Sequence, residues 1–403
     1  LDLLPMAILS IAIGSKSKGS GIIIRIIKDG KIGVSCTDNP KTWKNCLEAA
    51  CASARFSDPL PWKGLPGPEE VNQKPLALDK RITTDPALVI DLINRLKTGA
   101  EAYTADITSG SASVAISEHT IANSNGLFYS TTGTQVHVSL EMIAGQSTGY
   151  ESDTAWNLDI IDPEKTGKEA AFFAARGQGG EEIETGIYDV VLSPMAISQL
   201  LDAAVIPALS GRNVHTGRSV FAGKMGEHVA GDTISLIDDP MDSRGVANCA
   251  WDGEGMPVRK IPFIENGILR SFAYDLRTAY RYGENPTASA VRTGQSGAPA
   301  IGNHNLILKG PEYDILSDKS VYVHDLIGAH TANPMSGDFS VELSSPFFAY
   351  DGELQEPIRT GMISGNIFDI LHKIQGCSTD TRTLGSTIVP SVRLSGISVI
   401  GRG

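Results

Sequence analysis

Alternation of apolar and polar residues predicts a β-hairpin followed by a helix near the start of the chain. Two β-branched runs in residues 20–34 flank Asp29-Gly30, a pair typical of the type I′ turn that joins antiparallel strands. In residues 43–56 the apolar side chains recur instead at helical spacing, which predicts an amphipathic helix. The face that we expect to be buried consists of Trp43, Leu47, Cys51 and Ala54.

A proline-rich stretch separates this hairpin and helix from the rest of the chain. Proline lacks an amide hydrogen and fixes its φ angle, so we expect residues 59–82 to form a linker without regular structure. Its prolines are Pro59, Pro61, Pro66, Pro68 and Pro75. The segment that follows begins with Asp85-Pro86 and ends at Gly99, which are typical residues for the start and the end of a helix.

In residues 103–144 apolar and polar residues alternate with a period of two, which is the period of a strand with one buried face. The alternation is divided into four short runs, with turn residues at Asn125-Gly126 and at Gly133. The pattern therefore predicts an antiparallel meander.

The second half of the chain begins with helical patterns and continues mainly as strands. Residues 163–175 and 194–209 predict helices that flank a buried strand at 187–193, and Pro194 suits a first helical turn. After Gly211 the pattern is mostly β, apart from one late helix. Two hairpins with an Asn-Gly or Asp-Gly turn are expected there, at residues 262–270 and 347–355.

Helices and antiparallel strands thus occur in separate runs, which favours an α+β fold over a doubly wound sheet. We expect antiparallel sheets with a few amphipathic helices, an N-terminal α/β part and a large β-rich C-terminal domain. The predicted divisions are 1–58 for the hairpin and helix, 59–82 for the linker, 83–192 for a central α+β region and 193–403 for the C-terminal domain. Residues 1–14 are apolar but too short to span a membrane, and we expect the native chain to begin upstream of them.

Charge and cysteine content narrow the classes of function. The chain has 403 residues and a formal net charge of −12, without a Lys/Arg block that could neutralise phosphates, so we expect no direct contact with nucleic acid. Its cysteines are odd in number and include no C-x-x-C pair, which favours a reducing cytoplasm. They are Cys36, Cys46, Cys51, Cys249 and Cys377.

Three short motifs suggest chemistry, and each also has a purely structural interpretation. GQSTG around Ser147 matches a nucleophile elbow, which requires a strand before the serine and a helix after it, but the following residues suit a loop better. The glycine-rich segment 176–182 lacks the Lys-Ser/Thr of a phosphate-binding loop and suits a helix end. Asp238-Asp239-Pro240 suggests a cation site or, more simply, a charged turn.

Histidines offer a possible metal site. His215, Glu227 and His228 form one candidate set, but the two histidines are thirteen residues apart and glycines interrupt any helix between them. His324 and His330 are six residues apart with a glycine between them, which also differs from the usual ligand spacing. Spacing alone therefore favours turn or surface histidines.

Several long motifs in a fixed order resemble the TldD/PmbA family. They are GRSVFAGKMGEHV at 217–229, WDGEGMPVRKIPFIENGILRSFAYD at 251–275, the segment 333–371 that begins NPMSGDFSVELSS, and the closing PSVRLSGISVIG. The early hairpin, helix and proline-rich linker fit the same family. The resemblance covers nearly the whole chain; an older label for the family is modulator of DNA gyrase.

The resemblance implies a peptidase made of two similar subunits. TldD-type chains carry H-E-x-x-x-H on a helix, where two histidines hold zinc and the glutamate activates water. Counting back from GRSVFAG without gaps places that motif at Asp202 to Pro207 of this chain. Asp202 and Pro207 replace the histidines, and Ala203 replaces the glutamate. The family's further cysteine ligand lies near Cys377, which alone cannot make a zinc site.

The resemblance therefore implies a PmbA/TldE-type subunit without catalytic residues or cofactor of its own. We expect zinc only in a TldD-type partner, with which this chain would form a heterodimer that processes peptides and small unfolded proteins. A homodimer is the other expected assembly, and we expect no membrane association. Two alternatives stay open: a regulatory binding protein of the gyrase-modulator type, and an autonomous hydrolase that uses a site such as Ser147 or the His215/His228 region.

Overall fold

The chain begins with the hairpin that its sequence predicts. The computed structural model describes residues 15–69, 77–292 and 298–401, so the apolar segment 1–14 lies outside the described residues. Strands β1 (Ile22–Lys28) and β2 (Lys31–Thr37) pair antiparallel. Asp29 and Gly30 have φ angles of 53° and 76°, and positive φ at both central residues is the mark of the expected type I′ turn.

Helix α1 (Trp43–Ala54) forms where expected, after the short 3₁₀ turn η1 (Pro40–Thr42), but of its predicted buried face only Ala54 is buried. Cys46, Ala50 and Ala54 are buried, whereas Trp43 is 45% exposed and Cys51 is exposed. The physical reason is close packing, because a Cβ atom on Gly33 of β2 would overlap the backbone of α1 at Ala50. Only a face of small side chains can approach the hairpin so closely.

No helix or strand occurs in residues 55–69 or in 77–85. The first of these segments attaches the N-terminal hairpin to the distant C-terminal part of the chain. The amide of Leu60 donates to the carbonyl of Gly30 at 2.9 Å, and the ring of Trp62 packs edge-on against Tyr280 with centroids 5.1 Å apart. Arg25 of β1 forms an ion pair with the buried carboxylate of Glu254.

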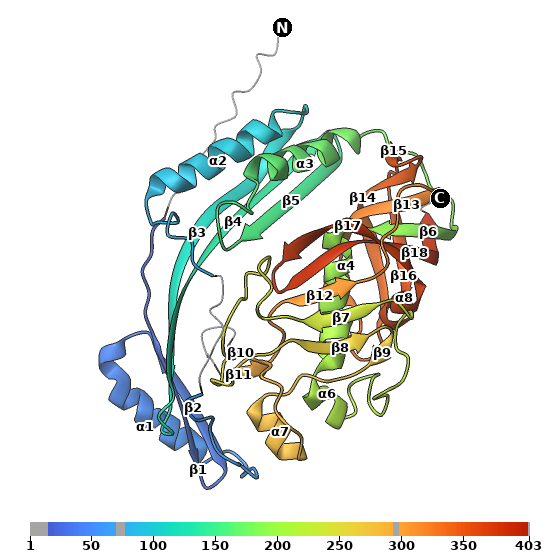
Figure 1. Ribbon diagram of the computed structural model, residues 1–403. Helices are drawn as coiled ribbons and strands as arrows, with labels where there is room; N and C mark the ends of the chain where they lie inside the picture. The colour runs from blue at the N-terminus through green and yellow to red at the C-terminus, as the bar shows by residue number, and fades with distance from the viewer. Residues whose placement is uncertain (1–14, 70–76, 293–297, 402–403) are drawn as a thin grey trace.

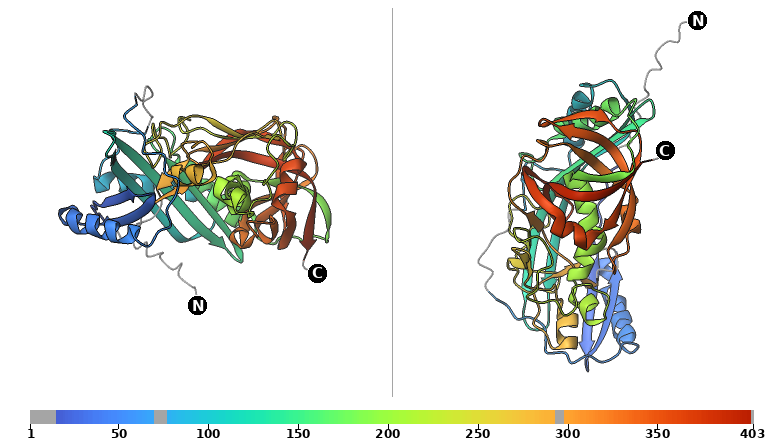
Figure 2. Two further views of the ribbon diagram at one scale, coloured as in Figure 1. Left: turned by 90° about the horizontal axis from the view of Figure 1, so that it is seen from below. Right: turned by 90° about the vertical axis from the view of Figure 1, so that its right-hand side faces the viewer.

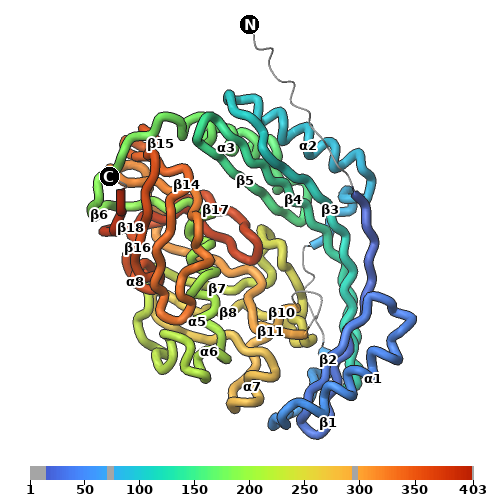
Figure 3. The backbone as a smooth tube through the Cα atoms, turned by 180° about the vertical axis from the view of Figure 1, so that it is seen from behind, coloured from blue at the N-terminus to red at the C-terminus, as the bar shows by residue number. Residues whose placement is uncertain are grey.

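The central part contains a three-stranded sheet covered by two helices (Figure 1). Its elements are α2 (Pro86–Ala100), β3 (Asp106–Ala122), β4 (Phe128–Ala144), β5 (Ser147–Ala155) and α3 (Pro163–Arg176). The turn at Gly126 is as predicted, with a φ of 86°, but Gly133 lies inside β4 and does not interrupt it. The structure therefore has the two long strands β3 and β4, followed by β5, where the sequence predicted four short strands. Viewed from behind, β3 and β4 run from the two helices to the N-terminal hairpin (Figure 3).

Helices α2 and α3 pack together through glycine. Asp85 caps α2 by accepting the amide of Ala87 at 2.9 Å, as expected. The helix ends at Ala100, one residue after the predicted end, and Gly99 is buried in its last turn. A Cβ atom there would overlap the carbonyl of Glu164, and one on Gly167 would overlap the carbonyl of Leu96, so both glycines set the distance between the helices.

The C-terminal part is built on one large sheet. In the described residues its order is β15-β14-β13-β6-β18-β12-β7-β8-β9, with β16 between β14 and β18 and with β17 beside β18. The strands are β6 (Gly186–Leu192), β7 (Ser235–Asp238), β8 (Ile261–Glu265), β9 (Ile268–Leu269), β12 (Leu306–Lys309), β13 (Ser320–Ile327), β14 (Asp338–Tyr350), β15 (Glu353–Pro357), β16 (Gly361–Asn366), β17 (Ile374–Leu384) and β18 (Thr387–Gly401). Strand β6 pairs with β13 and β18, so this sheet begins before the expected boundary at residue 193.

Both predicted hairpin turns occur in this sheet. Asn266-Gly267 joins β8 to β9, and Asp351-Gly352 joins β14 to β15; all four residues have positive φ. Further elements of this part are α6 (Gly211–His215), α7 (Leu276–Tyr282), α8 (Ile367–Lys373), the 3₁₀ turn η3 (Ala329–Thr331) and the hairpin β10 (Ala290–Arg292) with β11 (Pro299–Ile301). The α+β class with a β-rich C-terminal domain is thus confirmed. No helix of the described residues is long and apolar enough to cross a membrane.

Candidate functional site

One buried helix of the C-terminal domain changes its hydrogen-bonding pattern along its length. It runs as α4 (Pro194–Leu200), the π-helical segment η2 (Leu201–Val205) and α5 (Ile206–Leu209), beside the strands of the large sheet (Figures 1 and 2). Ser193 caps its start by accepting the amides of Met195 and Ala196 at 3.1 and 3.2 Å. Pro194 at the first turn therefore acts as the sequence predicts.

The π-helical segment overlaps the first four of the six residues that replace the zinc motif, residues 202–205. Its marker is the amide of Ile206, which donates to the carbonyl of Leu201, five residues earlier. Pro207 gives a local reason, because it has no amide hydrogen and its ring is incompatible with a regular α-helical turn. In an α-helix residues five apart would point about 140° away from each other, whereas a π-helical turn brings them to one side.

Asp202 and Pro207 accordingly face the same cavity. Its volume is about 230 Å³, and its lining includes Ile206, Asn303 and Leu306. Of the three motif positions, 202, 203 and 207, only Asp202 has a side chain that can bind a metal. The donor set of a zinc peptidase is therefore not present on this helix, although the helix has the shape that would group its ligands.

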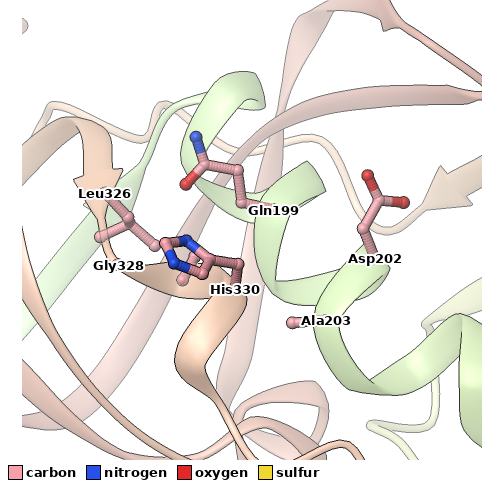
Figure 4. A pocket seen from close by; sticks show the side chains of 7 residues that line it. Gln199, Asp202, Ala203, Leu326, Gly328 and His330 are labelled. Carbon is pink, nitrogen blue, oxygen red and sulfur yellow. The ribbon is translucent and has the colours of Figure 1, made fainter.

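Asp202 also borders a second, larger cavity, of about 490 Å³, which is lined by the preceding turn of the helix. Figure 4 shows Gln199 and Asp202 on the helix, with His330 on the opposite turn η3. Solvent reaches the Asp202 carboxylate, but the walls of the two cavities surround it. This burial raises its pKa to about 6. The two cavities share the Asp202 carboxylate, and a perturbed pKa beside a cavity marks a candidate functional site.

The first set of candidate metal ligands does not come together. The Nε2 atom of His215 lies 3.1 Å from the Tyr274 hydroxyl, and its ring stacks on Tyr282 with centroids 4.2 Å apart. His228 instead lies 3.3 Å from Asp232, and Glu227 is exposed. Within the ranges that the structure describes, no three His, Cys, Asp or Glu side chains are grouped so that they could hold a metal ion.

The short motifs adopt their structural alternatives. Gly145 and Gln146 form the turn between β4 and β5, so Ser147 begins a strand and no helix follows it as an elbow requires. In the glycine-rich segment 176–182, Gly177 caps α3 and donates to the carbonyl of Phe173 at 3.1 Å. Asp239 accepts the amide of Met241 at 3.1 Å, as a turn residue does.

Cys377 is buried, and this burial raises the pKa of its thiol to about 11. Since a zinc ligand must be a thiolate, the environment of this cysteine does not favour metal binding.

Sequence reasoning missed a buried polar cluster between the central and C-terminal parts. Glu151 of β5 is 1% exposed and accepts two hydrogen bonds from Arg382 of β17, at 2.7 and 2.9 Å. His324 of β13 donates to the carbonyl of Tyr150 at 3.0 Å and stacks on Phe173 with centroids 3.6 Å apart. These residues come from three separate strands, so no local motif reveals them.

The surroundings shift the pKa values of the ionisable groups in this cluster. Burial lowers the pKa of His324, so its ring is neutral near pH 7. Burial by itself would raise the pKa of Glu151, but its interactions with His324 and Arg382, together with the hydrogen bonds from Arg382 and from the amide of Ser152, outweigh burial and lower that pKa. The cluster therefore contains a stable Glu151–Arg382 ion pair at the junction of the two parts.

Comparison with known proteins places this architecture in a family. Profiles of the PmbA/TldA metallopeptidases match the chain in three parts: domain 1 over residues 11–54, the central domain over 80–178 and the C-terminal domain over 185–401. An uncharacterized protein of Methanocaldococcus jannaschii is 32% identical, over 93% of this chain and 88% of its own length. The metalloprotease PmbA of Escherichia coli O157:H7 is 23% identical, over 91% of this chain and 83% of its own length.

A solved structure agrees closely. The crystal structure of TldE from Thermococcus kodakarensis superimposes with a TM-score of 0.89 and 26% identity, covering 97% of this chain and 92% of that chain. The fold and the altered helix thus define a chain with the metallopeptidase scaffold of these relatives. It belongs to the PmbA/TldD family, as its motifs indicate.

Proposed function

We propose that this chain is a PmbA/TldE-type subunit that does not cleave peptides by itself and works with a TldD-type zinc metallopeptidase. The observation that carries the proposal is the helix through Leu201–Val205, which places Asp202 and Pro207 on one cavity but has only Asp202 as a side chain that could bind zinc. Ala203 has no group that could take a proton from water, and Pro207 has none that could bind zinc. In the complex, the zinc ion of the partner would activate water.

The cavities beside Asp202 support a role in holding substrate. A groove with a carboxylate, an amide and an imidazole along its walls can accept hydrogen bonds from an extended peptide and donate hydrogen bonds to it. These groups belong to Asp202, Gln199 and His330. The substrate class that fits is an unfolded peptide, because folded proteins do not offer free backbone groups. This chain would therefore complete the enclosure around the peptide that the partner cleaves.

Co-expression with a TldD-type homologue from the same genome tests the proposal. We expect metal-dependent cleavage of an unstructured peptide by the pair and none by this chain alone. The matched control is a partner in which the glutamate of H-E-x-x-x-H is changed to glutamine, which should abolish cleavage by the pair. Metal-dependent cleavage by this chain alone would contradict the proposal, and so would equal cleavage by the partner with and without it.

The assembly can be measured in the same preparations. We expect the two chains to co-elute in size-exclusion chromatography as a heterodimer, and this chain alone to form a symmetric homodimer. Separate elution of the two chains at micromolar concentration would argue against a shared enzyme.

A further inference from the structure

The smaller cavity beside Asp202 has two amide side chains in its lining whose donors are used elsewhere. These side chains belong to Asn213 and Asn303. The Nδ2 atom of Asn213 donates to the carbonyl of Pro207 at 2.8 Å, and that of Asn303 donates to the carbonyl and the hydroxyl of Ser386 at 2.8 and 3.0 Å. Since a carbonyl can only accept, these bonds fix the place of each amide nitrogen and leave the Oδ1 atom for a ligand.

The third acceptor of the cavity is a carboxylate without a counter-ion. Within residues 15–69, 77–292 and 298–401, the Asp202 carboxylate has no hydrogen bond and no ion pair. Burial raises its pKa, and no neighbouring charge offsets that effect. Lysine and arginine are also absent from the described residues that line the cavity. An enclosed carboxylate lowers the free energy of unfolding unless a positive group pairs with it, so the cavity lacks a partner that a ligand can supply.

Most of the remaining wall of the cavity is apolar. Its apolar side chains include those of Ile206, Leu209, Phe263, Ala273, Ile301 and Leu306. Hard metal cations prefer about six or more oxygen ligands, so a wall of this composition does not suit them. The volume of about 230 Å³ lies below the roughly 300–1,000 Å³ of sites for drug-sized ligands. The cavity therefore suits a single side chain that has an apolar stem and a positively charged end.

We propose that this cavity binds the side chain of a lysine in the peptide substrate. An ammonium group donates three hydrogen bonds, which match the Asp202 carboxylate and the Oδ1 atoms of Asn213 and Asn303. The four methylene groups of lysine pack against the apolar wall. The inference rests on the proposed function, because it assigns a substrate side chain to the cavity beside the altered helix. Asp202 is then a residue that determines specificity, and this chain selects lysine-containing peptides for the pair.

Titration calorimetry of the purified chain tests the lysine site without requiring cleavage. The probes are two pentapeptides, both acetylated at the N-terminus and amidated at the C-terminus, with four alanines around a central residue. That residue is lysine in one peptide and norleucine in the other, which keeps the apolar stem and lacks the ammonium. At pH 7.5 we expect the lysine peptide to bind about tenfold more tightly, because hydrogen bonds between charged groups are strong in an enclosed site. Equal affinities, or no binding of either peptide at millimolar concentration, would overturn the proposal.

Two matched variants show whether the preference comes from this cavity. Asp202→Asn keeps the shape of the side chain and should reduce the affinity for the lysine peptide to that for the norleucine peptide. The control Asp232→Asn removes the same charge from a side chain that is 89% exposed and should keep the tenfold preference. Retention of the preference in Asp202→Asn, or an equal loss in both variants, would contradict the assignment. A norleucine peptide with a free N-terminus identifies the source of the ammonium: if it binds as tightly as the acetylated lysine peptide, the cavity takes an α-ammonium group and the lysine assignment is wrong.

Cleavage by the pair separates this inference from the proposed function. With the TldD-type homologue present, the lysine peptide should be cleaved with a KM about tenfold lower than that of the norleucine peptide and with a similar kcat, and Asp202→Asn should remove the difference in KM. Cleavage of both peptides with the same KM would contradict the lysine site and leave the proposed function intact. Cleavage of neither peptide by the pair would contradict the proposed function, and the calorimetric comparison of the wild type would still decide the lysine site.

Discussion

We expect the Glu151–Arg382 pair to contribute strongly to the free energy of unfolding, because it joins the central and C-terminal parts. The perturbation is Arg382→Met, which keeps the length of the apolar stem and removes the guanidinium. Glu151 is 1% exposed and takes hydrogen bonds at 2.7 and 2.9 Å from Arg382, so the variant leaves a buried carboxylate without its main partner. Removing one member of a buried pair costs about 3–5 kcal/mol.

Chemical denaturation followed by circular dichroism measures the free energy of unfolding. The matched control is Arg359→Met, since Arg359 lies 3.4 Å from Glu182 in a pair whose side chains are 63% and 66% exposed. An exposed pair contributes about 0–1 kcal/mol. The double variant Glu151→Gln with Arg382→Met should recover most of the loss, because no buried charge remains.

The pH dependence of the free energy of unfolding gives a second test of the same variant. Arg382 keeps the pKa of Glu151 below its usual value, so the pair stabilises the wild type above the unfolded pKa and loses its contribution as pH falls. Without Arg382, burial raises that pKa and Glu151 can be protonated in mild acid. The deficit of Arg382→Met should therefore be largest at pH 7–8 and smaller at pH 5. A loss no larger than that of Arg359→Met, or one independent of pH, would refute the reasoning.

Three further predictions concern the helices. The combined variant Asp202→His, Ala203→Glu and Pro207→His should retain zinc in metal analysis after dialysis, while the same variant with Pro207→Ala should not; equal zinc in both would show that residues 202 and 207 do not bind one ion. Gly99→Ala should lower the free energy of unfolding by about 2–3 kcal/mol because its Cβ meets the backbone of α3, whereas Gly67→Ala, which has open space, should change it little; similar losses would contradict the packing account. Asp202, with its pKa raised to about 6, makes stability fall as pH rises from about 4 to 6, so Asp202→Asn should be more stable than the wild type at pH 7 and not at pH 4. Parallel pH curves for the two proteins would show that the carboxylate is not perturbed.

Local patterns predicted the order of elements well, but not their faces or lengths. In α1 the larger apolar residues suggested a face with Trp43 and Leu47, while the structure buries Cys46 and Ala50, because the approach to Gly33 is decided by size and not by hydrophobicity. Gly133 was expected to form a turn, but the pairing of Ser117 with Gly133 continues the ladder between β3 and β4. Both errors arise because tertiary contacts override local preference.

The resemblance to the family located the candidate site in the sequence but did not predict the conformation of the helix there. Counting from the motifs identified Asp202 and Pro207, yet no residue pattern distinguished an α-helical turn from a π-helical one at that place. Glu151, His324 and Arg382 could not be grouped at all, because they meet only where β5 of the three-stranded sheet lies against β13 and β17 of the large sheet. Long-range arrangement of this kind has no signature in neighbouring residues.

The ion pair between Arg25 and Glu254 has a consequence for the order of events during biosynthesis. The two residues are separated by 229 positions. A ribosome that adds about 5–20 residues per second needs roughly 10–50 s to cover that interval. During most of that time the first hairpin and α1 have been synthesised, but Glu254, with which Arg25 pairs, has not. The isoleucine-rich strand β1 is therefore open to chaperones and proteases, without its C-terminal partner, for that whole interval.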